Sequence, residues 1–415
     1  MSQHLDTLET RDPQQREAEL FAALPQQIAH AQQHTPAFAR ILAGVNAAAI
    51  TSRAALAQLP VTRKYELLEL QKAARPADPF GGFSALVKGR QMARIFASPG
   101  PIYEPDGSGA DYWRVARALC AAGFREGDLV HNSFSYHMTP GAFMMESGAL
   151  AMGCTVFPAG TGQTEQQLGA IADLRPQAYT GTPSFLRILV EKAQEHGADI
   201  SSVKKAMVSG EAFPPSLRDW LAERGITAYQ CYATADLGLI AYETESRQGM
   251  VLDERVIVEI VRPGTGDPVP EGEVGELVVT TLSPGYPLIR FGTGDLSAIL
   301  PGTCPTGRTN ARIKGWMGRA DQTTKVRGMF VHPGQVADVA KRFPEILRAR
   351  LVVSGEMAND QMTLRVETQQ SDAALQAKVA EAVRDITKLR ADVECVAPGS
   401  LPNDGKVIED ARSYQ

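Results

Sequence analysis

Residues 177–208, QAYTGTPSFLRILVEKAQEHGADISSVKKAMV, decide the expected fold. Two β-rich runs, Gln177–Thr180 and Lys205–Val208, enclose a helical segment, Ser184–His196. The same alternation continues from about residue 94 to 300, for example in the helical run Gln166–Asp173 and the β-rich run Val256–Val261. Strands interleaved with helices of this length predict an α/β fold, with helices packed on parallel or mixed sheets.

The C-terminal part of the chain has a pattern of its own. Lys325–Val331 is strand-like, and Pro333 opens an amphipathic helix. Gln361–Glu367 alternates apolar and polar residues, which is the period of a half-buried strand. A helical repeat over Leu375–Leu389 and a short strand, Val393–Val396, complete a β-α-β-α-β order. This order is enough for a compact α+β domain.

The length of the chain also indicates two domains. At 415 residues it exceeds what one hydrophobic core usually serves. We therefore predict a large domain over residues 1–320 and a small one over residues 321–415.

Composition and charge narrow the class of protein. The net charge of −5 argues against nucleic acid as the main partner, because nucleic-acid-binding surfaces are basic. Five cysteines without a CxxC pair are typical of reduced thiols in a cytosolic protein. The polar N-terminus does not read as a signal peptide, and the most apolar stretch, Ala142–Phe157, is too short for a membrane span. We expect a cytoplasmic protein with small-molecule partners, and a homodimer is left open.

Five polar segments interrupt the strand and helix pattern: Ser209–Glu211, Tyr232–Asp236, Arg290–Asp295, Gly318–Gly328 and Leu401–Lys406. The first follows a strand directly, where ligands of α/β sheets commonly bind. The third combines two glycines with an aspartate suited to a sugar diol, and the fourth gathers cations suited to a phosphate. Taken singly, each is equally compatible with an ordinary turn, a solvated linker or an exposed tail.

In order and spacing, these segments resemble the acyl-adenylate-forming superfamily, and within it the phenylacetate–CoA ligase family. Three further segments carry the closer resemblance. Leu59–Lys64 is similar to that family's LPxTxK segment, Gly160–Glu165 to its GGQT turn and Gly181–Phe185 to its TPS segment. The resemblance extends over nearly the whole chain. It implies a large adenylating domain, a mobile C-terminal lid domain, and the use of ATP, Mg²⁺ and coenzyme A.

The resemblance also implies roles for single residues. Glu211 and Tyr232 would flank the adenine, Asp236 would hold Mg²⁺ and assist catalysis, and Asp321 would be the hinge. Lys406 matches the catalytic lysine, which neutralises charge when the carboxylate attacks the α-phosphate of ATP. The residues implied to bind the nucleotide are Ser209, Glu211, Tyr232, Asp295, Arg319 and Lys325.

The acid substrate is indicated less sharply. Tyr136, His137 and Phe143 fall where the family builds its carboxylate pocket, which favours an aryl or medium-sized carboxylic acid. Packing in the core explains Phe143 equally well.

One segment departs from the family pattern. Where the family has a phosphate loop of the form SSGTTGKP, Ser98–Pro105 reads SPGPIYEP. No lysine is present, the prolines have no N–H to donate, and Glu104 is expected to place a negative charge beside the pyrophosphate. Two interpretations follow. One is an AMP-forming acid–thiol ligase whose phosphates are held by other groups; the other is a homologue that binds nucleotide or acyl-CoA without efficient adenylation. The retained Asp295, Arg319 and Lys406 favour the ligase.

Overall fold

A computed structural model describes residues 4–99, 101–320, 322, 324–326, 329–355, 360–369 and 372–412. The chain forms two compact units. The first unit comprises Met1–Val258, Val279–Phe291 and Ile299–Trp316. The second unit comprises Glu259–Val278, Gly292–Ala298 and Met317–Gln415. The α/β class is confirmed, whereas a domain boundary at residue 321 stays a prediction.

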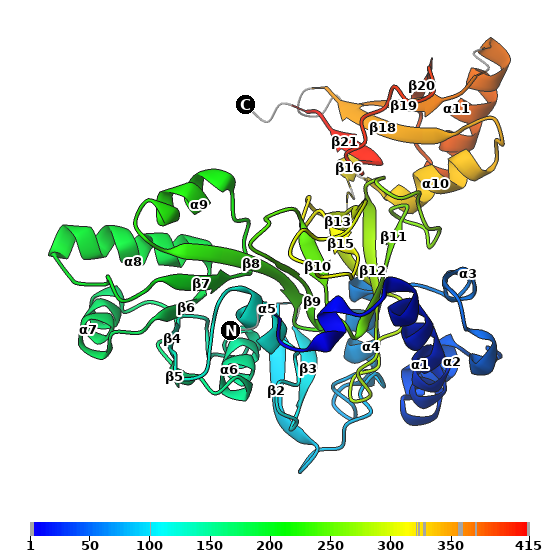
Figure 1. Ribbon diagram of the computed structural model, residues 1–415. Coiled ribbons are helices and arrows are strands. Elements are labelled where there is room, and N and C mark those ends of the chain that lie inside the picture. The colour runs from blue at the N-terminus through cyan, green and yellow to red at the C-terminus, as the bar shows by residue number, and fades with distance from the viewer. Residues whose placement is uncertain are drawn as a thin grey trace. The chain divides into compact units, whose positions relative to one another are not determined.

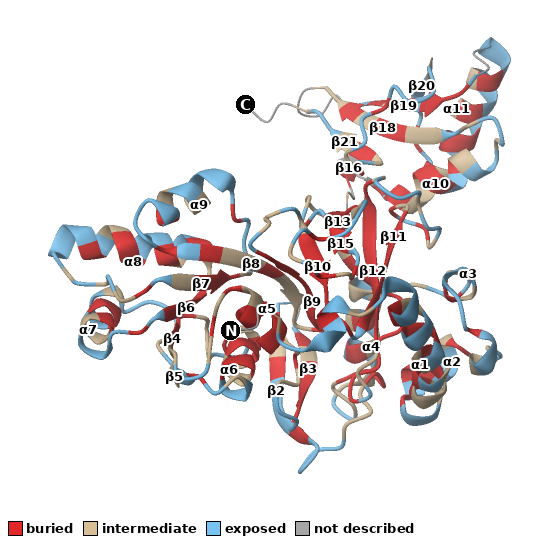
Figure 2. Ribbon diagram, viewed as in Figure 1, coloured by how far each residue is buried: buried red, intermediate tan, exposed pale blue. Residues whose placement is uncertain are grey.

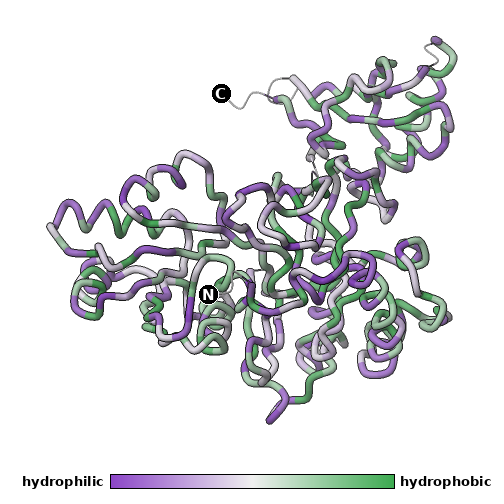
Figure 3. Tube along the Cα trace, viewed as in Figure 1, coloured by the Kyte–Doolittle hydropathy of each residue, from purple (hydrophilic) through white to green (hydrophobic). Residues whose placement is uncertain are grey.

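The first unit begins with a group of helices. The long helix α1 starts where the Asp12 side chain accepts a hydrogen bond from the Gln15 N–H and proline occupies the first helical position. Its buried residues include Leu20, Leu24 and Ile28, four apart, so one face is apolar. Figure 3 shows hydrophilic and hydrophobic residues alternating along the helices of the trace. The helices of this group are η1 (Thr7–Thr10), α1 (Pro13–His34), α2 (Pro36–Ile41), η2 (Ala47–Ala49), α3 (Arg53–Leu56) and α4 (Lys64–Ala74).

A nine-stranded sheet forms the centre of the first unit (Figure 1). Its strand order is β14-β15-β10-β9-β8-β7-β6-β4-β5. Strands β5, β4, β6, β7 and β8 pair in parallel, and the remaining pairs are antiparallel. The strands are β4 (Leu129–Asn132), β5 (Thr155–Phe157), β6 (Ala178–Gly181), β7 (Lys205–Val208), β8 (Thr227–Thr234), β9 (Gly238–Glu243), β10 (Met250–Leu252), β14 (Ile299–Leu300) and β15 (Arg312–Ile313). The helices between them are α5 (Ala116–Ala121), α6 (Gly141–Ala151), α7 (Thr164–Leu174), α8 (Pro183–His196) and α9 (Pro215–Ala222).

Both faces of this sheet are covered. Ala178 and Met207 belong to one core cluster, with residues of α5 and α6, while their neighbours Tyr179 and Ala206 belong to another, with residues of α7, α8 and α9. Successive strand residues point to opposite faces, so apolar residues of these strands pack on both sides of the sheet. Figure 2 shows strands β6 and β7 largely buried and the outer side of α8 exposed. The β-α-β pattern of residues 177–208 is thereby confirmed as β6, α8 and β7.

The structure contains two further sheets outside the C-terminal α+β part. Strands β2 (Met92–Ser98) and β3 (Ile102–Gly107) form an antiparallel hairpin. A four-stranded sheet has the order β1-β13-β12-β11, with β1 (Thr62–Arg63), β11 (Val256–Val261), β12 (Gly275–Thr281) and β13 (Phe291–Ser297). An ordinary turn was one of the alternatives that the sequence left open for Arg290–Asp295. Instead, most of this segment is strand β13, in which Phe291 and Leu296 are buried.

The C-terminal part of the second unit is an α+β structure. Its four-stranded sheet has the order β20-β19-β18-β21, and Leu351, Leu364, Val379 and Val383 form part of its core. The helices and strands are β16 (Thr324–Val326), β17 (Met329–Val331), α10 (Pro333–Lys341), β18 (Arg348–Ser354), β19 (Gln361–Glu367), α11 (Ala373–Thr387), β20 (Asp392–Val396) and β21 (Ile408–Asp410). The sequence pattern missed β18 and β21. None of the helices in the described ranges has the length and apolar character that crossing a bilayer requires.

Candidate active site

The first two polar segments meet at the carboxyl ends of β7 and β8. The Ser209 hydroxyl donates to the Cys231 carbonyl at 2.8 Å, so the end of β7 is bound to the residue that precedes Tyr232. Gly210 has a φ of +83°, and Phe134 lies against the position that a side chain there would take. Glu211 is exposed beside this turn, and Tyr232 is half-buried. The structure thus brings Ser209, Glu211 and Tyr232 to one edge of the parallel sheet, where α/β proteins bind ligands.

Asp236 lies in the turn between β8 and β9, and its side chain is only 1% exposed. Its Oδ2 atom accepts a hydrogen bond from the Lys64 ammonium at 2.8 Å, and its Oδ1 atom has no hydrogen-bond partner among the described residues. Lys64 is the first residue of α4, and its side chain is 32% exposed. Lys64 is a site residue that the sequence analysis missed, although it ends the LPxTxK-like segment.

The sequence led us to expect that Glu104 adds a negative charge beside a pyrophosphate, but the structure places this residue differently. It lies in β3, is fully buried and accepts hydrogen bonds from the backbone and hydroxyl of Ser98. Burial and, after it, the nearby charge of Asp236 raise the pKa of its carboxyl to about 8, against the opposing effects of Ser98 and Lys64. At neutral pH this carboxyl is therefore mostly protonated and points inward. We call Lys64, Ser98, Glu104 and Asp236 the buried acid cluster.

Two of the three residues expected around the acid substrate lie together. The rings of Tyr136 and Phe143 meet edge to face with their centroids 5.1 Å apart. The Tyr136 hydroxyl donates to the Glu146 carboxylate at 2.7 Å and accepts from the Asn132 amide at 2.8 Å, which fixes the orientation of the ring. Burial, followed by the bond to Glu146, raises the pKa of Tyr136.

This aromatic pair also adjoins the hairpin of β2 and β3. The Phe143 ring lies 5.3 Å from the Phe96 ring, and Phe96 is the strand partner of Glu104. The Arg94 guanidinium lies 4.4 Å above the Phe143 ring. His137, in contrast, is exposed and does not join this group. The aromatic pair therefore packs against the hairpin that carries Ser98 and Glu104 of the buried acid cluster.

In the second unit, Asp295 and Arg319 are bound to each other. The Arg319 guanidinium donates to the Asp295 carboxylate at 2.8 Å. Gly294 has a φ of +74°, and a Cβ atom there would lie 2.8 Å from the Arg319 guanidinium. Glycine at this position therefore allows the arginine to lie against the strand.

Arg319 and Lys406 line one cavity of about 150 Å³ in the second unit. Asp404, Glu409 and Asp410 line it as well, so cations and carboxylates face the same space. Lys406 itself is exposed. The arrangement places Arg319 and Lys406 at the same cavity, and their binding of an anion there stays a prediction.

Two of the sequence-predicted residues lie beyond what the structure describes. Asp321, the predicted hinge, is outside the described residues, and so is the side chain of Lys325, whose backbone belongs to β16. The remaining residues predicted to bind nucleotide or to catalyse adenylation fall into two sets: Ser209, Glu211, Tyr232 and Asp236 in the first unit, and Asp295, Arg319 and Lys406 in the second. The meeting of the two sets at one nucleotide site stays a prediction.

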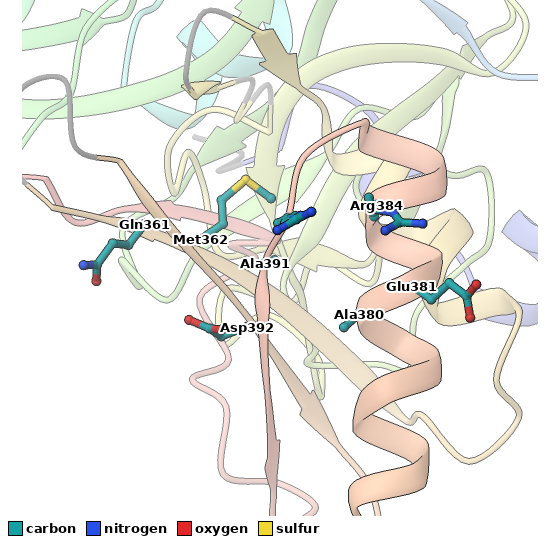
Figure 4. A pocket seen from close by; sticks show the side chains of 8 residues that line it. Gln361, Met362, Ala380, Glu381, Arg384, Ala391 and Asp392 are labelled. Carbon is teal, nitrogen blue, oxygen red and sulfur yellow. The ribbon is translucent and has the colours of Figure 1, made fainter.

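A larger cavity, of about 670 Å³, lies elsewhere in the second unit, between α11 and the first residues of β19 and β20 (Figure 4). Figure 4 shows Glu381 and Arg384 on the helix and Asp392 on the strand side. None of the sequence-predicted site residues lines it. Its described lining residues are Gln361, Met362, Ala380, Glu381, Arg384, Arg390, Ala391 and Asp392.

Comparison with known families identifies both parts of the chain. Residues 111–286 match the AMP-binding enzyme family, and residues 328–410 match the C-terminal domain of AMP-binding enzymes. A phenylacetate–coenzyme A ligase of Thermus thermophilus is 31% identical, over 90% of this chain and 91% of the relative. The chain belongs to the AMP-binding enzyme family. Within that family it falls among the phenylacetate–CoA ligase-like members, as the motifs predicted.

Other AMP-binding relatives agree with this placement. A phenylacetate–coenzyme A ligase of Escherichia coli is 30% identical, over 97% of this chain and 96% of the relative. Among solved structures, a 2-hydroxyisobutyryl-CoA ligase in complex with 2-HIB-AMP and CoA matches with a TM-score of 0.73 and 27% identity. That match covers 97% of this chain and 92% of the solved chain.

Proposed function

We propose that this protein is an AMP-forming acid–thiol ligase. It activates a carboxylic acid with ATP as an acyl-adenylate and then transfers the acyl group to coenzyme A. The observation that carries the proposal is 30–31% identity, over most of both chains, to enzymes named phenylacetate–coenzyme A ligase. A structural relative bound to an acyl-adenylate and CoA fits the same two-step reaction.

The residues of the second unit suit the first step. Attack of a carboxylate on the α-phosphate brings two anions together, so cations must stabilise the transition state. Lys406 and Arg319 line one cavity, and Arg319 is oriented by Asp295. We assign Lys406 to the neutralisation of developing charge and Asp295 with Arg319 to the ribose and phosphate.

Asp236 would hold the Mg²⁺ ion. Its Oδ1 atom is buried without a hydrogen-bond partner among the described residues, which leaves one carboxylate oxygen for a cation. Phosphate oxygens of the substrate would supply further ligands, as is common for Mg²⁺ in nucleotide sites. When bound, Mg²⁺ would screen the phosphate charges, and the Lys64 ammonium adds a second positive charge beside Asp236.

The aromatic pair suggests the class of acid. Tyr136 and Phe143 present ring faces and edges beside the end of the parallel sheet, and Tyr136 is held by Asn132 and Glu146. Such walls suit an aryl or medium-sized carboxylic acid. His137 is close in sequence but exposed, so we assign it to the outer edge of the proposed acid-binding site.

Location and assembly belong to the same proposal. All five cysteines are free, which suits the reducing cytoplasm. Light scattering of the purified protein distinguishes a homodimer from a monomer by its molar mass.

ATP–pyrophosphate exchange across a panel of aryl and aliphatic carboxylates tests the proposal. At least one acid is expected to give exchange that depends on both Mg²⁺ and the acid. Tight nucleotide binding without exchange for any acid would favour the alternative, a homologue that binds nucleotide or acyl-CoA without adenylation.

A further inference from the structure

The side chain of Gln322 binds the backbone on both sides of Lys406. Its amide nitrogen donates to the Gly405 carbonyl at 2.9 Å. Its amide oxygen accepts from the N–H of Val407 at 2.5 Å and of Ile408 at 2.9 Å. One half-buried side chain therefore satisfies three backbone groups that flank the predicted catalytic lysine.

The loop that carries Lys406 is held at other points as well. Gly405 has a φ of +72°, and a Cβ atom there would lie 2.7 Å from the Val274 side chain, so the loop packs closely within the second unit. The Asp404 carboxylate accepts the Lys406 N–H at 3.0 Å and forms an ion pair with Arg350. Lys406 itself is exposed, and among the described residues its ammonium has no hydrogen bond or ion pair. The direction of its side chain thus depends on the backbone around it.

We propose that Gln322 is a positioning residue for the adenylation step, which rests on the proposed function. It holds the backbone of residues 405–408 so that the Lys406 ammonium is directed at the reacting phosphate. It follows directly after Asp321, the predicted hinge, so it belongs to the part of the chain that moves with Lys406. Glutamine suits the task because its amide donates and accepts at once.

The test replaces Gln322 by methionine, which has a similar length and forms neither kind of bond. Gln335→Met serves as the matched control. Gln335 also uses its amide twice in the second unit, accepting from the His332 N–H at 3.0 Å and donating to the Ile386 carbonyl at 3.3 Å, away from the lysine loop. Q322M is expected to lower the maximal rate of ATP–pyrophosphate exchange about 10- to 100-fold, because small misplacements of a catalytic group are costly. The KM for ATP should stay within about twofold of wild type. Q335M should match the wild-type rate.

A double-mutant cycle separates positioning from a merely structural role. If Gln322 acts through Lys406, Q322M added to K406A should leave the residual exchange rate unchanged within about twofold. A further loss as large as in the wild-type background would overturn the proposal. Equal losses in Q322M and Q335M would also overturn it, because they would point to general destabilisation. If Q322M does not fold, Gln322→Glu, which keeps the acceptor and loses the donor to Gly405, takes its place with a smaller expected loss.

Hydrogen–deuterium exchange tests the hydrogen bonds of Gln322 to the lysine loop independently of enzymatic activity. In Q322M, the amides of Val407 and Ile408 should exchange about tenfold faster than in wild type, whereas Q335M should leave them unchanged. Unchanged exchange in Q322M would refute the proposal by itself. Wild-type protein that gives no pyrophosphate exchange with any acid would instead overturn the proposed function, and the deuterium measurement would still decide whether Gln322 holds the loop.

Discussion

Replacing Glu104 by glutamine is expected to remove a pH dependence of stability that the wild-type protein carries. Glu104 is fully buried in β3, and burial together with the charge of Asp236 raises the pKa of its carboxyl to about 8. In the unfolded chain the same carboxyl titrates near its ordinary value of 4.5. Between these two pH values, the folded state retains a proton that the unfolded state has released.

The sign and size of the effect follow from this difference in bound protons. Because the folded state binds more protons, the free energy of unfolding falls as the pH rises, by about 1.4 kcal/mol per pH unit. The loss begins near the unfolded value and is complete above the folded value. Between pH 5 and pH 7, Glu104 is therefore expected to cost the wild-type protein about 2–3 kcal/mol. The E104Q variant stays neutral, so it escapes this cost while keeping an acceptor for Ser98.

Urea unfolding of both proteins at pH values from 5 to 8 measures the effect. The two free energies of unfolding should be similar at pH 5 and diverge as the pH rises, with E104Q the more stable protein at pH 8. Taking the difference between the proteins at each pH cancels the titrating groups that do not interact with Glu104. Parallel pH profiles for the two proteins would refute the conclusion that Glu104 is buried as a neutral acid.

Three further predictions concern the lysines and the altered hairpin. Lys406→Ala should slow adenylate formation roughly 100-fold or more, since the positive charge is needed when two anions meet. CoA acylation from preformed acyl-adenylate should stay nearly intact. Equal losses in both half-reactions would argue against a catalytic role of Lys406. ATP·Mg²⁺ should bind weakly in calorimetry, because the prolines of Ser98–Pro105 have no N–H to offer a phosphate; a low-micromolar dissociation constant would contradict this. Lys64→Met should lower the free energy of unfolding by about 3–5 kcal/mol, because it leaves the buried Asp236 carboxylate unpaired. The double variant K64M/D236N should regain most of that loss. If the single and double variants are equally stable, the ion pair does not stabilise the fold.

Those parts of the fold that rest on local periodicity could be predicted from the sequence. The β-α-β motif formed by β6, α8 and β7 is one case, because strand and helix periods alternate there without interruption. Strand β19 was predicted with its observed bounds, since its apolar residues alternate strictly. Strand β18 was missed. Arg350 stands within it and is buried, where Asp404 and Glu409, far along the chain, form ion pairs with it.

The candidate site shows the same limit. The motif segments around Ser209 and Asp295 were visible because each is local. The pairing of Lys64 with Asp236 joins residues 172 positions apart, and no local pattern reveals it. Glu104 was expected to face the phosphates, whereas strand pairing with Phe96 places it inside. Charge in a sequence does not tell whether the folded protein keeps that charge, because burial decides the protonation state.

In the proposed reaction, one carboxylate oxygen of the acid attacks the α-phosphate of ATP. In the acyl-adenylate, this oxygen joins the acyl carbon to the phosphorus. The most direct measurement uses an accepted acid with ¹⁸O in both carboxylate oxygens, together with ATP, Mg²⁺ and CoA, and follows the products by mass spectrometry. Acyl-adenylate formation followed by thiol attack cleaves the bond between the acyl carbon and that oxygen, so AMP should carry one ¹⁸O atom. Products consisting of ADP and labelled inorganic phosphate, or AMP without label, would contradict the account.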